Sequence, residues 1–164
     1  MLIEAFNYKH WATQRTLAAI AQVDAVAFPA TVAFACQQLN HLRIVEELFQ
    51  ARLLGDAPPH TATNSADVTP LEQLAQRLEQ LQAWYAAYVP ALDAQQLQET
   101  VTFDFVDGRG GRMSRQEILF HIINHGTYHR GAIGHALDLV QVAHPADTYT
   151  VFIHEAEPER RLRG

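Results

Sequence analysis

Apolar residues recur along four long stretches of the chain with the spacing of one face of an α-helix. In the first stretch, Leu2, Phe6, Leu17 and Ile20 fall on a single stripe when each residue advances by about 100° around the helix axis. The same periodicity predicts long helices over residues 2–23, 31–54, 70–89 and 115–140. The pattern therefore indicates a protein built mainly from helices.

The boundaries of the third helix are predicted by its flanking residues. Thr69 is a candidate N-cap, Pro70 suits the first helical position, and Glu72 completes a capping box with Thr69. Pro90 would clash with the preceding turn, so this helix is expected to end near Val89.

The segment before the fourth helix follows a different period. Val101, Phe103 and Phe105 alternate with polar residues, and the sequence DGRGG follows. Strict alternation followed by a glycine-rich turn predicts a small β-hairpin. Ser114 and Glu117 then form a second capping box, which predicts the start of the last long helix.

These elements predict an all-α fold with one domain over residues 1–164. Four long helices suit a four-helix bundle, and the polar stretch between the second and third predicts a long crossover connection. The hairpin precedes the last long helix, and Asp147 is expected to cap a short C-terminal helix through Ile153. Residues 157–164 are expected to form a flexible tail.

Composition narrows the classes of function. The net charge is −6, which disfavours nucleic acid as a partner, because phosphate binding needs a surplus of Lys and Arg. Cys36 is the single cysteine, so neither an intrachain disulfide nor a cysteine-based metal site is possible. No apolar run approaches the ~20 residues of a membrane span, and the N-terminal residues lack the apolar core of a signal peptide. A soluble, cytoplasmic protein with no membrane partner is expected.

The last long helix carries three histidines at intervals of four residues. Relative to Ile118, His125 and His129 fall within about 20° around the helix axis, on the apolar stripe, whereas His121 falls near about −60°. His41 lies on the apolar stripe of the second helix, so it also points inward.

Two inward histidines four residues apart can bind one cation together, and His41 is the candidate third ligand. A lone inward histidine is more often a hydrogen-bonded core residue, but three buried imidazoles all need partners. His121 is a candidate for the rim of the site, and His10, at the edge of the first helix's stripe, is a candidate to line the same pocket.

Several short strings resemble the sequence signature of the DinB (damage-inducible) family. They are NHGTYHRG, the capped helix start MSRQEILFH before it, NYKHWATQRTL near the N-terminus, and LNHL in the second helix. The resemblance extends from the first helix to near Val140. The first string is fairly specific, and the others are weak individually.

This resemblance implies a four-helix bundle with a crossover, commonly dimeric, that binds a divalent ion. The family ligands correspond here to His41, His125 and His129. Related members are transferases and isomerases that use a low-molecular-weight thiol such as bacillithiol, mycothiol or glutathione. A small-molecule substrate of that kind and a homodimer are therefore expected. Ala132 and Thr13 stand where the family commonly has Gln and Asn, at positions that could shape a substrate pocket.

Three neutral histidines would leave a divalent ion an open coordination position, as in catalytic zinc sites. The first hypothesis is a metal-dependent enzyme, a thiol transferase or, next, a hydrolase; zinc, nickel and iron all accept imidazole ligands. The second is a non-catalytic metal-binding or stress-response protein, and the third a helical interaction module without metal. Spacing ties no carboxylate to the histidines, so the sequence names no catalytic base.

Overall fold

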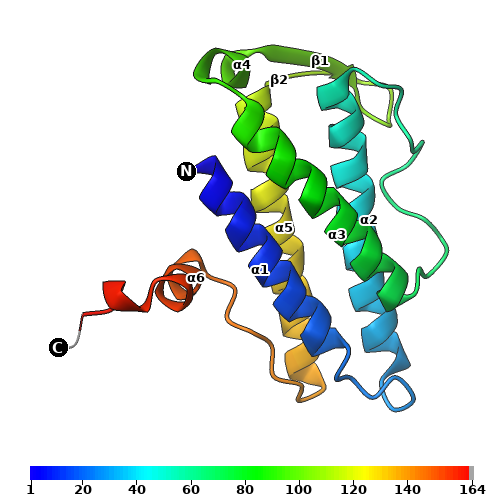
Figure 1. Ribbon diagram of the computed structural model, residues 1–164. Coiled ribbons are helices and arrows are strands. Elements are labelled where there is room, and N and C mark those ends of the chain that lie inside the picture. Colours follow the sequence, from blue (N-terminus) through cyan, green and yellow to red (C-terminus); the bar gives the residue numbers. More distant parts are fainter. Residues whose placement is uncertain (163–164) are drawn as a thin grey trace.

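Four long helices lie side by side, with a two-stranded hairpin across one end of the bundle (Figure 1). The computed structural model describes residues 1–162, and residues 163 and 164 of the predicted tail lie outside the described range. The long helices are α1 (Leu2–Ile20), α2 (Pro29–Leu54), α3 (Leu71–Tyr88) and α5 (Arg115–Leu139). The predicted all-α fold is confirmed.

The connection from α2 to α3 is the predicted long crossover. It runs back along the length of the bundle, so α2 and α3 point the same way (Figure 1). Both α1 and α2 pack against α3 and against α5, which puts α1 and α2 at opposite corners of the bundle. The pairing of α2 with α5 matters most here, because these two helices carry His41, His121, His125 and His129.

Shorter elements complete the chain. They are η1 (Val89–Ala91), α4 (Ala94–Gln98), β1 (Thr100–Asp104), β2 (Gly110–Ser114), α6 (Tyr149–Ala156) and η2 (Pro158–Arg160). Antiparallel β1 and β2 form the predicted hairpin, with Thr100 opposite Ser114. Helix α4 was not predicted from the sequence, although it begins with a capping box between Asp93 and Gln96.

One of the predicted helix caps is present and two are wrong. The Ser114 hydroxyl accepts from the Glu117 backbone N–H, and the Glu117 carboxylate accepts from the Ser114 N–H at 2.7 Å. In α3, however, Pro70 occupies the N-cap position with extended backbone, so Thr69 lies one residue too early to cap. Before α6 the N-cap is Thr148, without a side-chain bond, because the Asp147 carboxylate is bound elsewhere.

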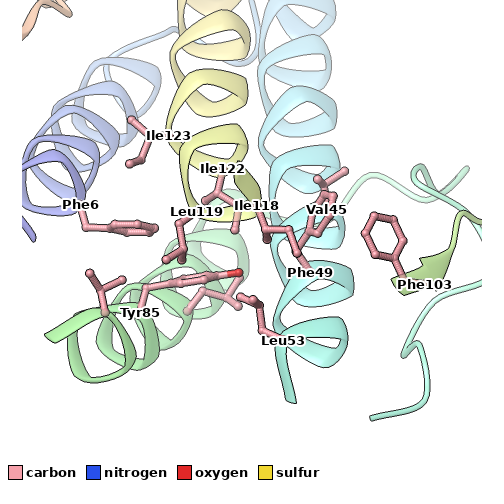
Figure 2. Close-up of a cluster of buried hydrophobic side chains, with 12 residues drawn as sticks. Phe6, Val45, Phe49, Leu53, Tyr85, Phe103, Ile118, Leu119, Ile122 and Ile123 are labelled. Carbon is pink, nitrogen blue, oxygen red and sulfur yellow. The ribbon is translucent and has the colours of Figure 1, made fainter. Parts of the chain in front are cut away.

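The core consists of two apolar clusters along the bundle. The cluster nearer the hairpin joins all four helices to the sheet through Phe6, Phe49, Tyr85, Phe103 and Ile118 (Figure 2). The second cluster, toward the other end, centres on buried residues such as Leu17, Leu39, Leu74, Ile133 and Leu137. The stretch of α2 and α5 between the two clusters is where the inward histidines lie.

A buried ion pair crosses the bundle between α1 and α2. The Lys9 ammonium lies 2.9 Å from the Glu46 carboxylate, and both side chains are almost completely enclosed. Tyr85 donates to the backbone carbonyl of Glu46 at 3.0 Å, which helps to hold this turn of α2. The pair satisfies two charges that would each be costly to bury alone.

The C-terminal segment is attached to the bundle by a second buried charge. Arg130 Nε on α5 donates to the Asp147 carboxylate at 2.8 Å, and the Tyr8 hydroxyl donates to the same carboxylate. Phe152 on α6 packs against Tyr8 and Trp11 of α1. Within the described residues, no helix has the length and apolar character needed to cross a membrane.

Candidate metal centre

His41 on α2 and His125 and His129 on α5 meet between the two packed helices. One ring nitrogen from each lies within 4.8 Å of the others. Nε2 of His125 lies 3.1 Å from Nε2 of His41 and 3.1 Å from Nε2 of His129. All three side chains are partly buried. The structure thus brings together the three histidines that the helical projection selected.

The outer nitrogens of two of these rings are bound to acceptors. Nδ1 of His41 donates to the Thr63 carbonyl at 2.8 Å, and Nδ1 of His129 donates to the Gln38 side-chain oxygen. With the proton on Nδ1, each Nε2 presents a lone pair toward His125. This arrangement fixes both rings in the tautomer and orientation of metal ligands.

The spacing of the three Nε2 atoms fits a shared cation. Nitrogens bound at ~2.0–2.1 Å in a tetrahedral site lie about 3.3 Å apart, close to the 3.1 Å separations found here. Without a cation, the single proton that His125 Nε2 can carry satisfies at most one of the two facing lone pairs. The donor set and its geometry therefore suit a divalent ion.

The surroundings keep the α5 pair in the neutral form that binds metal. Burial, followed by the neighbouring imidazoles of His129, His121 and His41, lowers the pKa of His125 to about 3. Burial and then His41 lower the pKa of His129 to about 4. Both rings are consequently uncharged at neutral pH, and protons do not compete for their nitrogens there.

The two secondary candidates have different positions. His121 stacks on His125, with ring centroids 5.1 Å apart and planes inclined by 23°, and burial lowers the pKa of His121. His10 instead lies toward α3, with Nδ1 3.7 Å from the Glu79 carboxylate, and does not line the cavity beside the histidines. His10 faces away because it falls at the edge of its helical stripe, on the side that α3 covers.

A cavity of about 300 Å³ adjoins the centre. His41 lines it from α2, and His121 and His125 line it from α5. The hairpin and its turn contribute Phe105 and Met113 to the lining. A small molecule in this cavity would therefore contact two of the three converging histidines directly.

Sequence reasoning missed the residues that orient the rings. Gln38 lies one turn before His41 on the same side of α2, so its spacing could have placed it among the residues that face the α5 histidines. Thr63 contributes only a backbone carbonyl, which no side-chain pattern reveals. Neither Thr13 nor Ala132, the two departures from the family pattern, lines the cavity.

Comparison with known proteins agrees with this centre. No curated protein and no solved structure matches the chain. The model of the DinB family, in contrast, matches residues 1–161, almost the entire sequence. The match includes all four long helices and all three converging histidines, and the chain belongs to the DinB family.

Proposed function

We propose that His41, His125 and His129 bind one divalent metal ion through their Nε2 atoms. The convergence of the three Nε2 atoms, two of them with lone pairs fixed by bonds at Nδ1, carries this proposal. We further propose that the protein is a metal-dependent enzyme that transfers a low-molecular-weight thiol, with hydrolysis as the alternative reaction.

The cavity supports a catalytic rather than a purely structural ion. Within the described residues, the ligand group consists of three histidines, and a structural zinc site takes four protein ligands. When bound, a divalent cation supplies a positive charge that lowers the pKa of a thiol or a water molecule at its open position. The cavity beside His41 and His125 gives such a molecule a route to that position.

The chain's own residues position the reactants. Gln38 and Thr63 hold two of the rings so that their lone pairs converge. Phe49 and Val45 line the cavity beside the histidines, and their apolar surface excludes water from the space around a bound ligand.

A non-catalytic, stabilising role for the ion is the second candidate function. The observation that supports it is the location of the histidines. An ion held between α2 and α5, between the two core clusters, would join two helices that already pack together. Such an ion would stabilise the bundle by mass action whether or not any chemistry follows.

Metal binding is tested on protein purified without a histidine tag and loaded separately with zinc, nickel, manganese or iron. Elemental analysis should find one ion per chain in at least one loaded form, and His41→Ala or His125→Ala should lose it. His135→Ala is the matched control, because this exposed histidine lies on the same helix outside the cluster. Equal metal content in all variants would contradict the proposed site.

The reaction is tested on each loaded form by following thiol consumption in the presence of an aromatic electrophile. Loss of turnover in His125→Ala, with turnover retained in His135→Ala, would support the transferase. The non-catalytic role would be favoured if the loaded protein held stoichiometric metal and melted at a higher temperature than the metal-free protein, but turned over neither thiols nor hydrolysable esters.

A further inference from the structure

The cavity beside the histidines extends along α2 as far as an arginine. His41, Val45, Leu48, Phe49 and Arg52 all line it, at the spacing of a single helical stripe. His41 and Arg52 are eleven positions apart, which corresponds to about 16 Å of helix rise. His41 and Arg52 therefore lie at opposite ends of the α2 side of this cavity, whose lining between them is mainly apolar apart from His121.

Arg52 is held in place by aromatic rings and not by a carboxylate. Its guanidinium carbon lies 4.8 Å from the ring centre of Phe49, 4.5 Å from that of Phe103 and 5.6 Å from that of Phe105. One Nη2–H group donates to the Asp104 carbonyl at 2.9 Å.

The lack of an acidic partner distinguishes Arg52 from other enclosed arginines. Arg43, Arg115 and Arg130 each lie within 4.0 Å of a carboxylate, and among residues 1–162 Arg52 has no such contact. Burial lowers the pKa of Arg52. A guanidinium has five N–H donors, so most of those on Arg52 remain available to a ligand.

We propose that Arg52 binds an anionic group of the molecule that occupies this cavity. Given the proposed metal site, the substrate class is an elongated molecule with three parts. One end carries a metal-binding donor such as a thiol, the middle is apolar, and the far end carries a carboxylate. Arginine is well suited to this role, because its planar donors match the two oxygens of a carboxylate.

The opposing interpretation is that Arg52 only fastens the hairpin to α2. Its contacts with Phe103, Phe105 and the Asp104 carbonyl would serve that purpose without any ligand. The two interpretations differ in whether a negative charge at the far end of a ligand improves binding.

The test compares two probes of equal length, ω-mercaptoundecanoate and ω-mercaptoundecanol, by calorimetry and by the absorption of cobalt-loaded protein. The carboxylate is expected to bind about tenfold more tightly than the alcohol, as a charge-assisted hydrogen bond predicts. Arg52→Met should bring this ratio close to one. Arg112→Met, which removes an exposed arginine of the hairpin, should leave the ratio unchanged.

Two results would overturn the proposal. One is equal affinity of the two probes for the unsubstituted protein, a comparison that needs no variant to fold. The other is an equal effect of Arg52→Met and Arg112→Met, which would indicate general charge attraction. Undecanoate and undecanol, which lack the thiol, are measured on metal-free protein in parallel. If cobalt does not bind but the binding of undecanoate still depends on Arg52, the proposed metal site is wrong and the proposed anion site is supported.

Discussion

Gln38→Ala should weaken metal binding at the proposed site, although Gln38 is not one of the three proposed ligands. Its side-chain oxygen accepts the Nδ1 proton of His129, which fixes this ring in the tautomer that presents Nε2 to the centre. Without this acceptor the ring can rotate or carry its proton on Nε2. Removing such a partner typically reduces metal affinity by about 10–100-fold, or about 1.4–2.7 kcal/mol.

The measurement is a competition titration of zinc between the protein and a chromophoric chelator. Gln37→Ala is the control, because the adjacent residue on α2 is exposed and points away from the histidines. Gln38→Glu keeps an acceptor oxygen and should retain affinity, whereas His129→Ala sets the scale for a lost ligand. If Gln38→Ala binds zinc within twofold of Gln37→Ala, the orienting role assigned to Gln38 is wrong.

Three further predictions concern stability. Gly126→Ala should destabilise the protein by about 1–3 kcal/mol, because an added Cβ would lie 2.9 Å from Arg130 Nη1. Gly131→Ala on the same helix meets nothing within 4 Å and should stabilise by up to about 1 kcal/mol; equal melting temperatures would contradict the difference. Lys9→Met leaves the buried Glu46 carboxylate unpaired and should cost about 3–5 kcal/mol in urea unfolding, largely recovered when Glu46→Met is added; a loss below about 1 kcal/mol would refute this reasoning. Finally, metal-free protein should lose stability as the pH falls from 6.5 toward about 4, because the two α5 site histidines have lowered pKa values and bind protons only in the unfolded chain. Each histidine contributes a slope of up to about 1.4 kcal/mol per pH unit to the free energy of unfolding. A free energy of unfolding that does not change across this pH range would contradict the prediction.

Features set by neighbouring residues could be predicted from the sequence. The capping box of Ser114 and Glu117 depends on residues three apart, and the hairpin on alternation followed by a turn. The meeting of His41 with the α5 pair also followed, because both helices expose an inward stripe and a bundle packs such stripes together.

Features that depend on distant partners could not be predicted. Aspartate is a preferred residue at helix N-caps, which is why Asp147 was expected to cap α6. In the structure, the buried guanidinium of Arg130 binds its carboxylate instead, and this charge-assisted contact is stronger than a bond to a backbone N–H. Phe34 lies on the same helical stripe as Val45 and Leu48, yet its side chain is 37% exposed near the start of α2. Helical periodicity gives a side chain's direction, but it does not show whether another element covers that direction.

The proposed metal ligands and part of the cavity lining come from different elements of the fold. All three converging histidines lie on long helices whose neighbouring turns are packed into the core, which fixes the relative positions of their nitrogens. Part of the cavity wall, in contrast, comes from the turn and second strand of the hairpin, where Phe105 and Val106 are exposed to solvent. Turns tolerate substitution better than packed helices do. Changes in the hairpin should therefore alter which ligand enters the cavity while metal affinity stays constant, whereas changes at the histidines should alter both.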